Sequence, residues 1–271
     1  MKYTLPVLLL VLIASCKKNE PAVNVTITTK YKLVKTYNNG KVNVIYNYNA
    51  DNLVKSITTY YYYRAAHGSG PWTYNTYPTG YLYDNYKRVY RTFVSDSNFY
   101  SSEYKYSTDG NLLGRYNKQG VLLSEYKYTS GRVSVINSYD INGKKITTEA
   151  ISYSPDGNVT SRELTYLGDT TTPTGPYGHQ LFRVVTTYKQ YDDCFTIHSA
   201  MPAIGIILND AWKGNNPVAW EVVNYSTGGF VQKATHTCGY KYNDAKLPVL
   251  SIHDTYSDSY HSTDTMEYFY Q

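Results

Sequence analysis

Two cysteines and two histidines in the second half of the chain have side chains that form cross-links or bind metals. Cys194 is followed by His198, and Cys238 is preceded by His236. Two cysteines in an oxidising compartment can form a disulfide, whereas two thiolates with two imidazoles are a ligand set for a structural zinc ion. We expect a Cys194–Cys238 disulfide, which would close a loop of about 44 residues and contribute about 3 to 4 kcal/mol. Two unpaired thiols or a zinc site are the alternatives.

Aromatic side chains in two irregular stretches could bind a sugar. Trp72, Tyr74 and Tyr77 lie close together in the first stretch, and Trp212 lies in the second. Aromatic rings offer an apolar face, and the polar tips of Trp and Tyr form hydrogen bonds with hydroxyl groups. We therefore predict that these four residues bind a ligand. The alternative is that they cap the ends of a sheet, because Tyr is abundant throughout the chain.

The sequence contains no constellation typical of an enzyme. It has no Gly-x-Ser-x-Gly, His-Glu-x-x-His, phosphate-binding loop or EF-hand pattern. Glu103, Glu125 and Glu163 lie on predicted strands, where we expect them to pair with Lys or Arg across the sheet. His253 and His261 lie among aspartates without a fixed ligand spacing, so we predict solvent-facing strands there. We therefore predict no enzymatic activity, no cofactor and no metal ion.

The composition favours a half-buried β-sheet. The chain has 271 residues, of which 34 are Tyr and only 6 are Phe, so much of its apolar surface carries a hydroxyl group. Such side chains suit a sheet face that packs the ring and leaves the oxygen in water. The net charge is +5, but Lys and Arg are scattered along the chain. Because nucleic-acid binding needs basic residues gathered on one face, we expect no nucleic-acid partner.

Turn signals and a short repeat together predict the fold class. The sequence Glu-Tyr-Lys-Tyr occurs at residues 103–106 and again at 125–128. In an extended strand its two tyrosines project from one face and its lysine from the other. The turn signals follow at nearly even intervals: Asp109-Gly110, Gln119-Gly120, Ser130-Gly131, Asn142-Gly143 and Asp156-Gly157. This pattern predicts a mainly β fold, an antiparallel meander of repeated β-hairpins forming an open twisted sheet or a partly closed barrel.

Three stretches interrupt the repeat. Residues 65–80 and 168–180 are rich in Gly, Pro and Thr, so we predict long surface loops. Residues 201–220 could hold a short helix or a buried strand followed by a turn, because so short an apolar run has no decisive periodicity. Residues 181–271 either form a separate subdomain or complete the same sheet.

The first residues have the pattern of an export signal. Lys2 precedes an apolar core, residues 5–13, which is too short to cross a bilayer as a helix. The following Ile13-Ala14-Ser15-Cys16 resembles the lipobox of bacterial lipoproteins. This resemblance implies that Cys16 receives a diacylglycerol through a thioether and becomes the mature N-terminus. The alternative is an ordinary signal peptide with a chance cysteine.

The residues after Cys16 extend this resemblance. A cysteine followed by two lysines is similar to the start of many Bacteroidetes outer-membrane lipoproteins. Surface export in that phylum is linked to acidic residues near the cysteine, and here Glu20 stands alone, so the face of the outer membrane stays open. We divide the chain into a signal peptide (1–15), a lipidated tether (16–24) and a β domain (25–271).

The repeated hairpin resembles a known family as well. A unit of Tyr-x-Tyr, a few polar residues with Asp or Gly, an aliphatic residue and a polar strand recurs over residues 40–165 and partially over 214–250. It resembles the YD repeats of the Rhs family, and more closely the Bacteroidetes lipoproteins of unknown function that carry degenerate YD-like hairpins. The segment Gly214-Asn215-Asn216-Pro217 is also similar to one in those lipoproteins. The chain is too short to enclose a toxin, and no Rhs toxin or autoprotease motif is evident.

Two functions agree with these features. The first is a lipid-anchored, non-enzymatic cell-envelope protein that binds a glycan or protein partner through its aromatic loops. The second is a structural or assembly-accessory envelope lipoprotein that pairs a sheet edge with another protein by strand addition.

Overall fold

The structure, a computed structural model, describes residues 31–64, 72–94, 97–167, 181–197, 201 and 215–271. They include sixteen β-strands and the short 3-10 helix η3 (Thr227–Gly229). None of the described residues lies in a helix long and apolar enough to span a membrane. The strands are β1 (Leu33–Asn38), β2 (Lys41–Tyr48), β3 (Val54–Arg64), β4 (Trp72–Tyr83), β5 (Val89–Val94), β6 (Ser97–Tyr106), β7 (Leu112–Tyr116), β8 (Leu122–Thr129), β9 (Arg132–Tyr139), β10 (Lys145–Tyr153), β11 (Val159–Tyr166), β12 (Leu181–Phe195), β13 (Asn215–Ser226), β14 (Val231–Tyr242), β15 (Pro248–Ser257) and β16 (His261–Tyr270).

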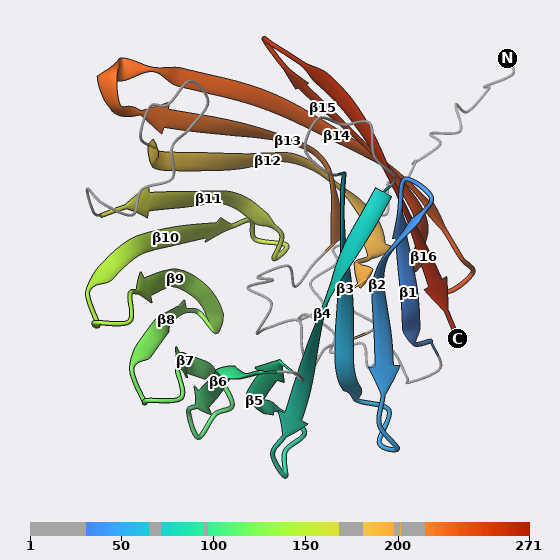
Figure 1. The fold of residues 1–271 in the computed structure, drawn as a ribbon. Coiled ribbons are helices and arrows are strands. Elements are labelled where there is room, and N and C mark those ends of the chain that lie inside the picture. Colours follow the sequence, from blue (N-terminus) through green and yellow to red (C-terminus); the bar gives the residue numbers. More distant parts are fainter. Residues whose placement is uncertain (1–30, 65–71, 95–96, 168–180, 198–200, 202–214) are drawn as a thin grey trace, which may run out of the picture.

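The sixteen strands form one closed antiparallel barrel. Each strand pairs with its neighbours in the chain, and β1 pairs with β16, where Leu33 lies opposite Tyr270. Figure 1 shows the strands following one another around a single wall. The predicted antiparallel meander is confirmed, and its closure is complete rather than partial. Because β12 to β16 complete this wall, the described strands from residue 181 onward belong to the same sheet.

Side chains alternate between the two faces of the wall. Tyr104 in β6 is buried and Lys105 is exposed, as the repeat predicts. The buried apolar side chains of a single closed wall lie on its inner face, toward the space that we call the lumen. A residue directly opposite an inward residue on the next strand also points inward. The strand register therefore assigns side chains to the lumen or to the outer surface.

Seven of the hairpin turns share one construction. In each turn the N–H of the first residue donates to the carbonyl oxygen of the fifth, and the N–H of the fourth donates to the carbonyl of the first. The fourth residue has a positive φ and is Gly in four turns, whereas Asn52, Lys87 and Lys246 occupy it in the other three. This is the three-residue hairpin loop with a bulge. The first residues are Asn49, Asp84, Ser107, Asn117, Asp140, Ser154 and Asn243.

The acidic or amide residue of the Tyr-Asp and Tyr-Asn pairs has a defined role in these turns. The side-chain oxygen of Asn117 accepts hydrogen bonds from the backbone N–H groups of Gln119 and Val121, at 3.0 and 2.8 Å. Asn49, Asp84, Asp140 and Asn243 do the same in their own turns. Because these donors would otherwise be unpaired at a tight turn, the side chain holds the turn closed.

The tyrosine that precedes many of these turns ties two strands together. The Tyr153 hydroxyl donates to the carbonyl oxygen of Val133 at 2.8 Å, joining β10 to β9. Equivalent bonds surround one end of the barrel, which we call the tyrosine rim. They are Tyr48 to Leu33, Tyr83 to Val54, Tyr106 to Val89, Tyr191 to Val159, Tyr240 to Pro217 and Tyr270 to Pro248. Burial raises the pKa of rim tyrosines such as Tyr48, Tyr83 and Tyr153 above its ordinary value, so their hydroxyls stay protonated and can donate.

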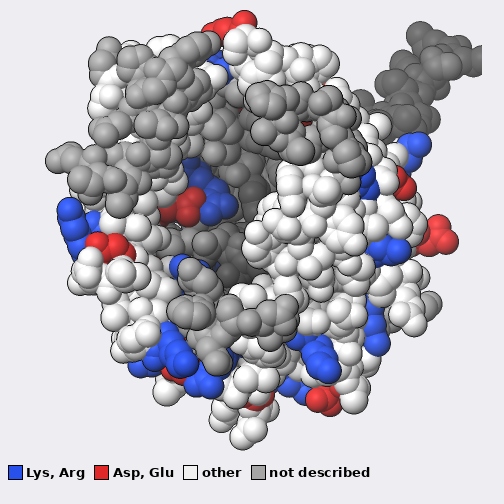
Figure 2. All heavy atoms as spheres, viewed as in Figure 1, with Lys and Arg blue, Asp and Glu red and all other residues white. Residues whose placement is uncertain are grey.

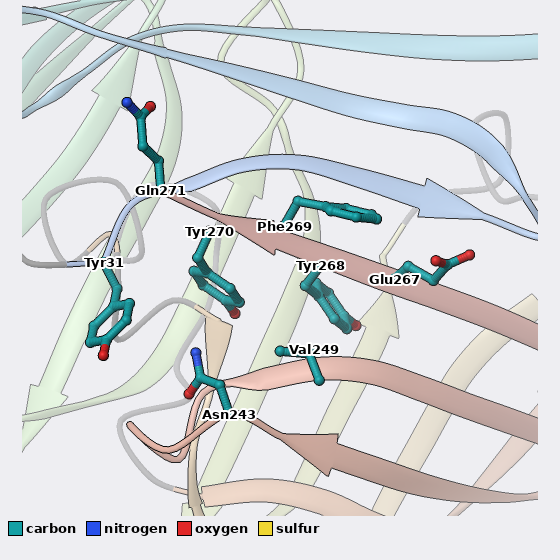
Figure 3. Close-up of a pocket in the computed structure, with 8 residues that line it drawn as sticks. All are labelled: Tyr31, Asn243, Val249, Glu267, Tyr268, Phe269, Tyr270 and Gln271. Carbon is teal, nitrogen blue, oxygen red and sulfur yellow. The ribbon is translucent and has the colours of Figure 1, made fainter.

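Both ends of the described chain meet at the tyrosine rim. Lys32 and Gln271 exchange two backbone hydrogen bonds there, at 2.9 and 3.0 Å. Figure 3 shows Tyr268 and Tyr270 turned to one side of β16 and Phe269 to the other. The aliphatic core lies at this end as well, and Leu33, Val54, Val89, Leu112, Val159 and Met201 are buried in it. The barrel therefore has a packed end, with the opposite end called here the far rim.

The structure changes the prediction for one of the two long loops. Residues 72–80 are part of β4 rather than a loop, because their alternating aromatic and Thr side chains suit a strand. The β3–β4 hairpin extends beyond its neighbours at the far rim. On β3, pairing with β2 ends at Thr59, and on β4, pairing with β5 begins at Thr79, so the residues between them pair only within the hairpin. Residues 65–71 and the second predicted loop, 168–180, lie outside the described residues. The end of the 201–220 segment is the beginning of β13.

Candidate functional site

One half of the lumen wall, from β7 to β15, carries the large polar side chains. Arg162 lies opposite Ile151, and Glu149 lies opposite Ile136. Both isoleucines are buried, so this arginine and this glutamate point inward, where they form a 2.7 Å ion pair. Figure 2 shows the hollow of the barrel with basic and acidic groups in its wall. The large polar side chains that point inward on this half include Arg115, Glu149, Arg162, Trp220, Asn224, Gln232, His236 and His253.

Three aromatic rings meet on neighbouring strands of this half. Trp220 of β13 lies opposite His236 of β14, and His253 lies on β15. The indole and the His236 ring are parallel within 3°, with centroids 5.2 Å apart. The centroids of Trp220 and His253 are 5.0 Å apart, with the ring planes inclined by 23°. The register of β13, β14 and β15 thus brings three rings to one level of the lumen.

The two imidazoles meet edge to edge. Nδ1 of His236 lies 3.1 Å from Nε2 of His253, and the ring centroids are 5.2 Å apart with the planes inclined by 24°. The distance between the ring centres exceeds the nitrogen–nitrogen distance by almost the width of one imidazole ring. The two facing nitrogens therefore lie nearly on the line that joins the ring centres. This is the geometry of an N–H···N hydrogen bond, with the indole beside both rings. Thr255 Oγ1 lies 3.1 Å from His236 Nδ1 and completes the group.

The surroundings favour the neutral form of His236. Burial, together with the nearby His253, lowers the pKa of His236. Cys238 lies opposite His253 on the neighbouring strand, and burial raises the pKa of its thiol. A thiol with a raised pKa is a poor nucleophile, because the thiolate is the reactive form. The arrangement therefore presents ring N–H groups, ring nitrogens and hydroxyls to the lumen rather than a reactive cysteine.

The Gly-Asn-Asn-Pro segment serves the fold rather than the lumen. Asn216 is buried, and its amide nitrogen donates to the carboxylate of Asp192, to the carbonyl of Phe195 and to the hydroxyl of Tyr242. Tyr242 also donates to Asp192, and the Asn215 amide donates to the backbone carbonyl of Asp192. These bonds hold the end of β12 against β13 and β14, so this segment has a structural explanation.

The predicted aromatic set is not gathered in one place. Tyr74 and Tyr77 are three residues apart in β4 and therefore point to opposite faces. Tyr74 packs against Tyr60 and Tyr62, with centroids 5.6 and 5.8 Å apart, whereas Tyr77 packs against Tyr61 at 5.2 Å. Trp72 is described only as the first residue of β4, and Trp212 and the lipidation candidate Cys16 lie outside the described residues.

The predicted disulfide is absent, and both cysteines are free thiols. Cys194 belongs to β12 and Cys238 to β14, with β13 between them. Strands are about 4.8 Å apart, so an intervening strand separates the two backbones by about 9 to 10 Å, beyond the reach of a disulfide. Of the alternatives, two unpaired thiols agree with the structure. Within the described ranges, no three His, Cys, Asp or Glu side chains gather in a way that could hold a metal ion.

The outer surface confirms the interpretation of two of the three glutamates. Glu103 pairs with Arg91, and Glu163 pairs with Arg183 at 2.7 Å, in both cases across neighbouring strands as the sequence predicts. For Glu125 the predicted pairing across the sheet is wrong: it pairs at 3.6 Å with Lys127, which lies two residues later on the same face of the same strand.

Sequence reasoning missed the part played by Trp220. Apolar and polar residues alternate along Trp220-Glu221-Val222, which places the indole and the valine on one face of a strand. The local sequence does not show that this face lines the lumen of a barrel. His236 and Cys238 stand out in the sequence as a close pair of ligating residues, and alternation does place both inward. Their meeting with His253 depends on the register between β14 and β15, which no single segment encodes.

Comparison with known proteins gives a fold likeness alone. No family model matches the chain, and no curated protein matches it. A porin-like protein from Bacteroides uniformis is similar in structure, with a TM-score of 0.51 and 14% identity over 84% of this chain and 90% of the other. A porin-like protein from Bacteroides vulgatus has a TM-score of 0.39 and 10% identity, over 89% and 99% of the two chains. The TcdB2–TccC3 structure has a TM-score of 0.39 and 11% identity, and only 10% of that chain is covered, against 81% of this one. The first likeness agrees at a coarse level with the resemblance to Bacteroidetes proteins, and at this identity it establishes a shared barrel fold.

Proposed function

We propose that this chain is a lipid-anchored, non-enzymatic protein of the cell envelope that binds a glycan inside its barrel. The observation that carries the proposal is the group formed by Trp220, His236, His253 and Thr255 on the lumen wall. A sugar combines apolar C–H faces with closely spaced hydroxyls. A wall that combines aromatic rings with neutral donors and acceptors offers complementary groups. The binding site thus lies in the lumen instead of the loops.

The charges on the outer surface support a barrel that stands in water. Outward ion pairs join β5 to β6, β11 to β12 and β13 to β14, the last between Lys233 and Glu221 at 2.5 Å. Barrels that cross a membrane present an apolar band to lipid, where charged groups cost about 2 to 4 kcal/mol each. We therefore place the wall in the aqueous phase and assign membrane attachment to Cys16.

The position of the termini then relates the proposed anchor to the barrel. Lys32 lies at the tyrosine rim, and Cys16 lies sixteen residues earlier, which corresponds to at most about 55 Å of extended chain. In this proposal the chain that leads to Cys16 leaves the barrel at the packed tyrosine rim rather than at the far rim. Replacing Cys16 with Ala should abolish incorporation of a labelled fatty acid and release the protein from the membrane fraction.

The alternative function, pairing of a sheet edge with another envelope protein, has less structural support. Strand addition needs an unpaired strand edge, and closure gives each described strand two neighbours. Only overhanging parts of strands retain free edges, of which the clearest is the β3–β4 hairpin beyond Thr59 and Thr79. An assembly role would have to use such an overhang, and replacing Tyr74 with Ala would then disrupt it while leaving the lumen intact.

Isothermal titration calorimetry of the purified protein tests glycan binding. Neutral oligosaccharides from bacterial and host polymers should be titrated into wild-type protein and into the Trp220→Phe and His253→Gln variants. We expect saturable binding that each variant weakens at least tenfold, with Tyr74→Phe as the matched control that leaves binding unchanged. If the glycans bind equally well to the Trp220→Phe variant, the lumen group is not the site.

A further inference from the structure

Arg115 stands out among the arginines of the barrel. It lies on β7 opposite Tyr104 of β6 and Ser124 of β8. Both partners are buried on the inner face, so the register directs Arg115 into the lumen. The buried Leu112 lies three residues earlier in β7, and a register shift between β6 and β7 lets both residues point inward. Arg115 therefore lies beside the aliphatic core, on the side toward the turn that begins at Asn117.

The other arginines whose side chains are described each have an acceptor. Arg88 pairs with Asp84, Arg91 with Glu103, Arg162 with Glu149 and Arg183 with Glu163, and Arg132 donates to the carbonyl of Ser154. Arg115 makes neither an ion pair nor a hydrogen bond with any residue in the described part of the chain. Its Nε is buried and without an acceptor.

An unpaired guanidinium at this place is costly for the fold. A buried donor without an acceptor costs about 1 to 3 kcal/mol. The guanidinium cannot relieve that cost by losing its proton, because it stays charged at every physiological pH. Its partners across the two neighbouring strands, Tyr104 and Ser124, carry no carboxylate, and its charge acts against the burial that raises the pKa of Tyr126. Among the described residues, Arg115 thus brings a positive charge into the lumen without an acceptor for its guanidinium.

We propose that Arg115 is the counter-ion for a negatively charged group on the ligand, a carboxylate or a sulfate. The planar fork of a guanidinium binds such groups through two parallel hydrogen bonds. Arg162, which points into the lumen from β11, is already neutralised by Glu149, so Arg115 is the described lumenal arginine that can bind an anion. In combination with the proposed function, on which this last step rests, the ligand is an acidic glycan.

Side-chain NMR of the full mature protein tests the anion site without knowledge of the natural ligand. The Nε–H signal of Arg115 is assigned by its disappearance in the Arg115→Gln variant. Sodium sulfate, sodium galacturonate and neutral galactose are then titrated at constant ionic strength. We expect a saturable shift of the Arg115 signal with the two anions and none with galactose, while the signals of Arg162 and Arg183 stay in place. No shift, or an equal shift of every arginine, overturns the proposal.

A binding measurement separates this proposal from the proposed function. Acidic and neutral oligogalactosides of equal length are titrated into wild-type protein, Arg115→Gln, Arg115→Lys and the outer-surface control Arg183→Gln. We expect Arg115→Gln to weaken acidic binding at least tenfold and neutral binding less than twofold, and Arg115→Lys to keep part of the acidic preference. If sulfate shifts Arg115 but no glycan binds, the glycan function fails and the anion site stands. If both glycans bind equally to wild type, the acidic preference is wrong while the glycan function stands.

Discussion

The hydroxyl of Tyr153 donates a 2.8 Å hydrogen bond to the carbonyl oxygen of Val133, near the start of the strand that precedes its own. The same relation recurs around the tyrosine rim and joins seven of the eight even-numbered strands to the odd-numbered strand before them. In each case the ring fills the inner face and its oxygen pairs a backbone carbonyl. The abundance of Tyr over Phe thus has a structural cause, because Phe would fill the same space and leave the carbonyl unpaired.

Replacing Tyr153 with Phe should lower the free energy of unfolding by about 1 to 2 kcal/mol, since it removes one hydrogen bond and leaves a carbonyl oxygen without a donor. Urea denaturation followed by circular dichroism measures the difference. The control is Tyr61→Phe, because the Tyr61 side chain is 58% exposed and should change stability by less than 0.5 kcal/mol on the usual scale for surface positions. Equal losses for both variants would contradict this role of the hydroxyl.

Replacing Lys87 with Gly should stabilise the barrel by about 1 kcal/mol. Lys87 has a φ of 60° at the turn position where four equivalent turns have Gly, and a side chain with a Cβ is strained in this region. The same urea titration measures the gain. The reverse change, Gly120→Ala, places a Cβ at φ +80° in open space and should cost a similar amount through backbone strain alone. A destabilised Lys87→Gly variant would show that the lysine side chain contributes more than the strain costs.

Alkaline pH should destabilise the fold cooperatively. Burial raises the pKa of Tyr46 and Tyr126 to about 12, above the ordinary value of 10. Between pH 10 and 12 the unfolded chain therefore holds fewer protons on these tyrosines than the folded chain, so the free energy of unfolding falls as pH rises. Ultraviolet absorbance should show these phenols ionising together with the loss of circular dichroism signal. If all tyrosines ionise gradually near pH 10 while the protein stays folded, the burial of Tyr46 and Tyr126 is wrong.

The sequence of the repeat unit predicts most of the local fold. Alternation in Glu-Tyr-Lys-Tyr correctly separates Tyr104 from Lys105, and the Asp-Gly and Asn-Gly pairs correctly mark hairpin turns. Closure was not predictable in the same way, because it depends on the pairing of Leu33 with Tyr270, at opposite ends of the described chain. No local pattern records that contact, which forms only if strand number, tilt and register agree around the whole barrel.

The candidate site was less accessible to sequence reasoning than the fold. The aromatic cluster at Trp72, Tyr74 and Tyr77 reads as one group in a loop, but strand alternation sends Tyr74 and Tyr77 to opposite faces. The lumen group joins Trp220, His236 and His253 from three strands whose register sets their meeting. The disulfide prediction failed for a related reason, since the sequence does not show that β13 separates the strands of the two cysteines.

Cys194 and Cys238 should react differently with a thiol reagent in the native protein. Cys194 is half-buried and Cys238 is buried, with no disulfide between them. Alkylation of non-reduced protein followed by peptide mass mapping should label Cys194 first, and Cys238 only after unfolding. The Cys194→Ser variant should lose the early label and keep its stability. A disulfide-linked pair of the two cysteine peptides would show that the strands approach more closely than in this structure.

Acidification should destabilise the fold through His236. Burial and the neighbouring His253 lower the pKa of His236 below its ordinary value of 6.5, whereas the unfolded chain keeps that ordinary value. Below pH 6.5 the unfolded state therefore binds the proton more readily than the folded state, and the free energy of unfolding falls as pH falls. A one-unit difference between the two pKa values corresponds to about 1.4 kcal/mol.

The groups that face His236 do not offset this effect. Trp220 lies beside it on β13, His253 and Thr255 face it from β15, and the Cys238 thiol is its inward neighbour along β14. Among these described neighbours, none carries a carboxylate that could stabilise an imidazolium. Urea titrations at pH 7.5, 6.5 and 5.5 should therefore show a loss of stability in wild-type protein that is smaller in His236→Gln. His261→Gln, at an exposed position of β16, provides the comparison with an outer-surface imidazole. If the free energy of unfolding of His236→Gln depends on pH as strongly as that of wild-type protein, this prediction is wrong. The His236–His253 pair would then be able to bind a proton in the folded state without destabilising it, as a cation beside the indole of Trp220.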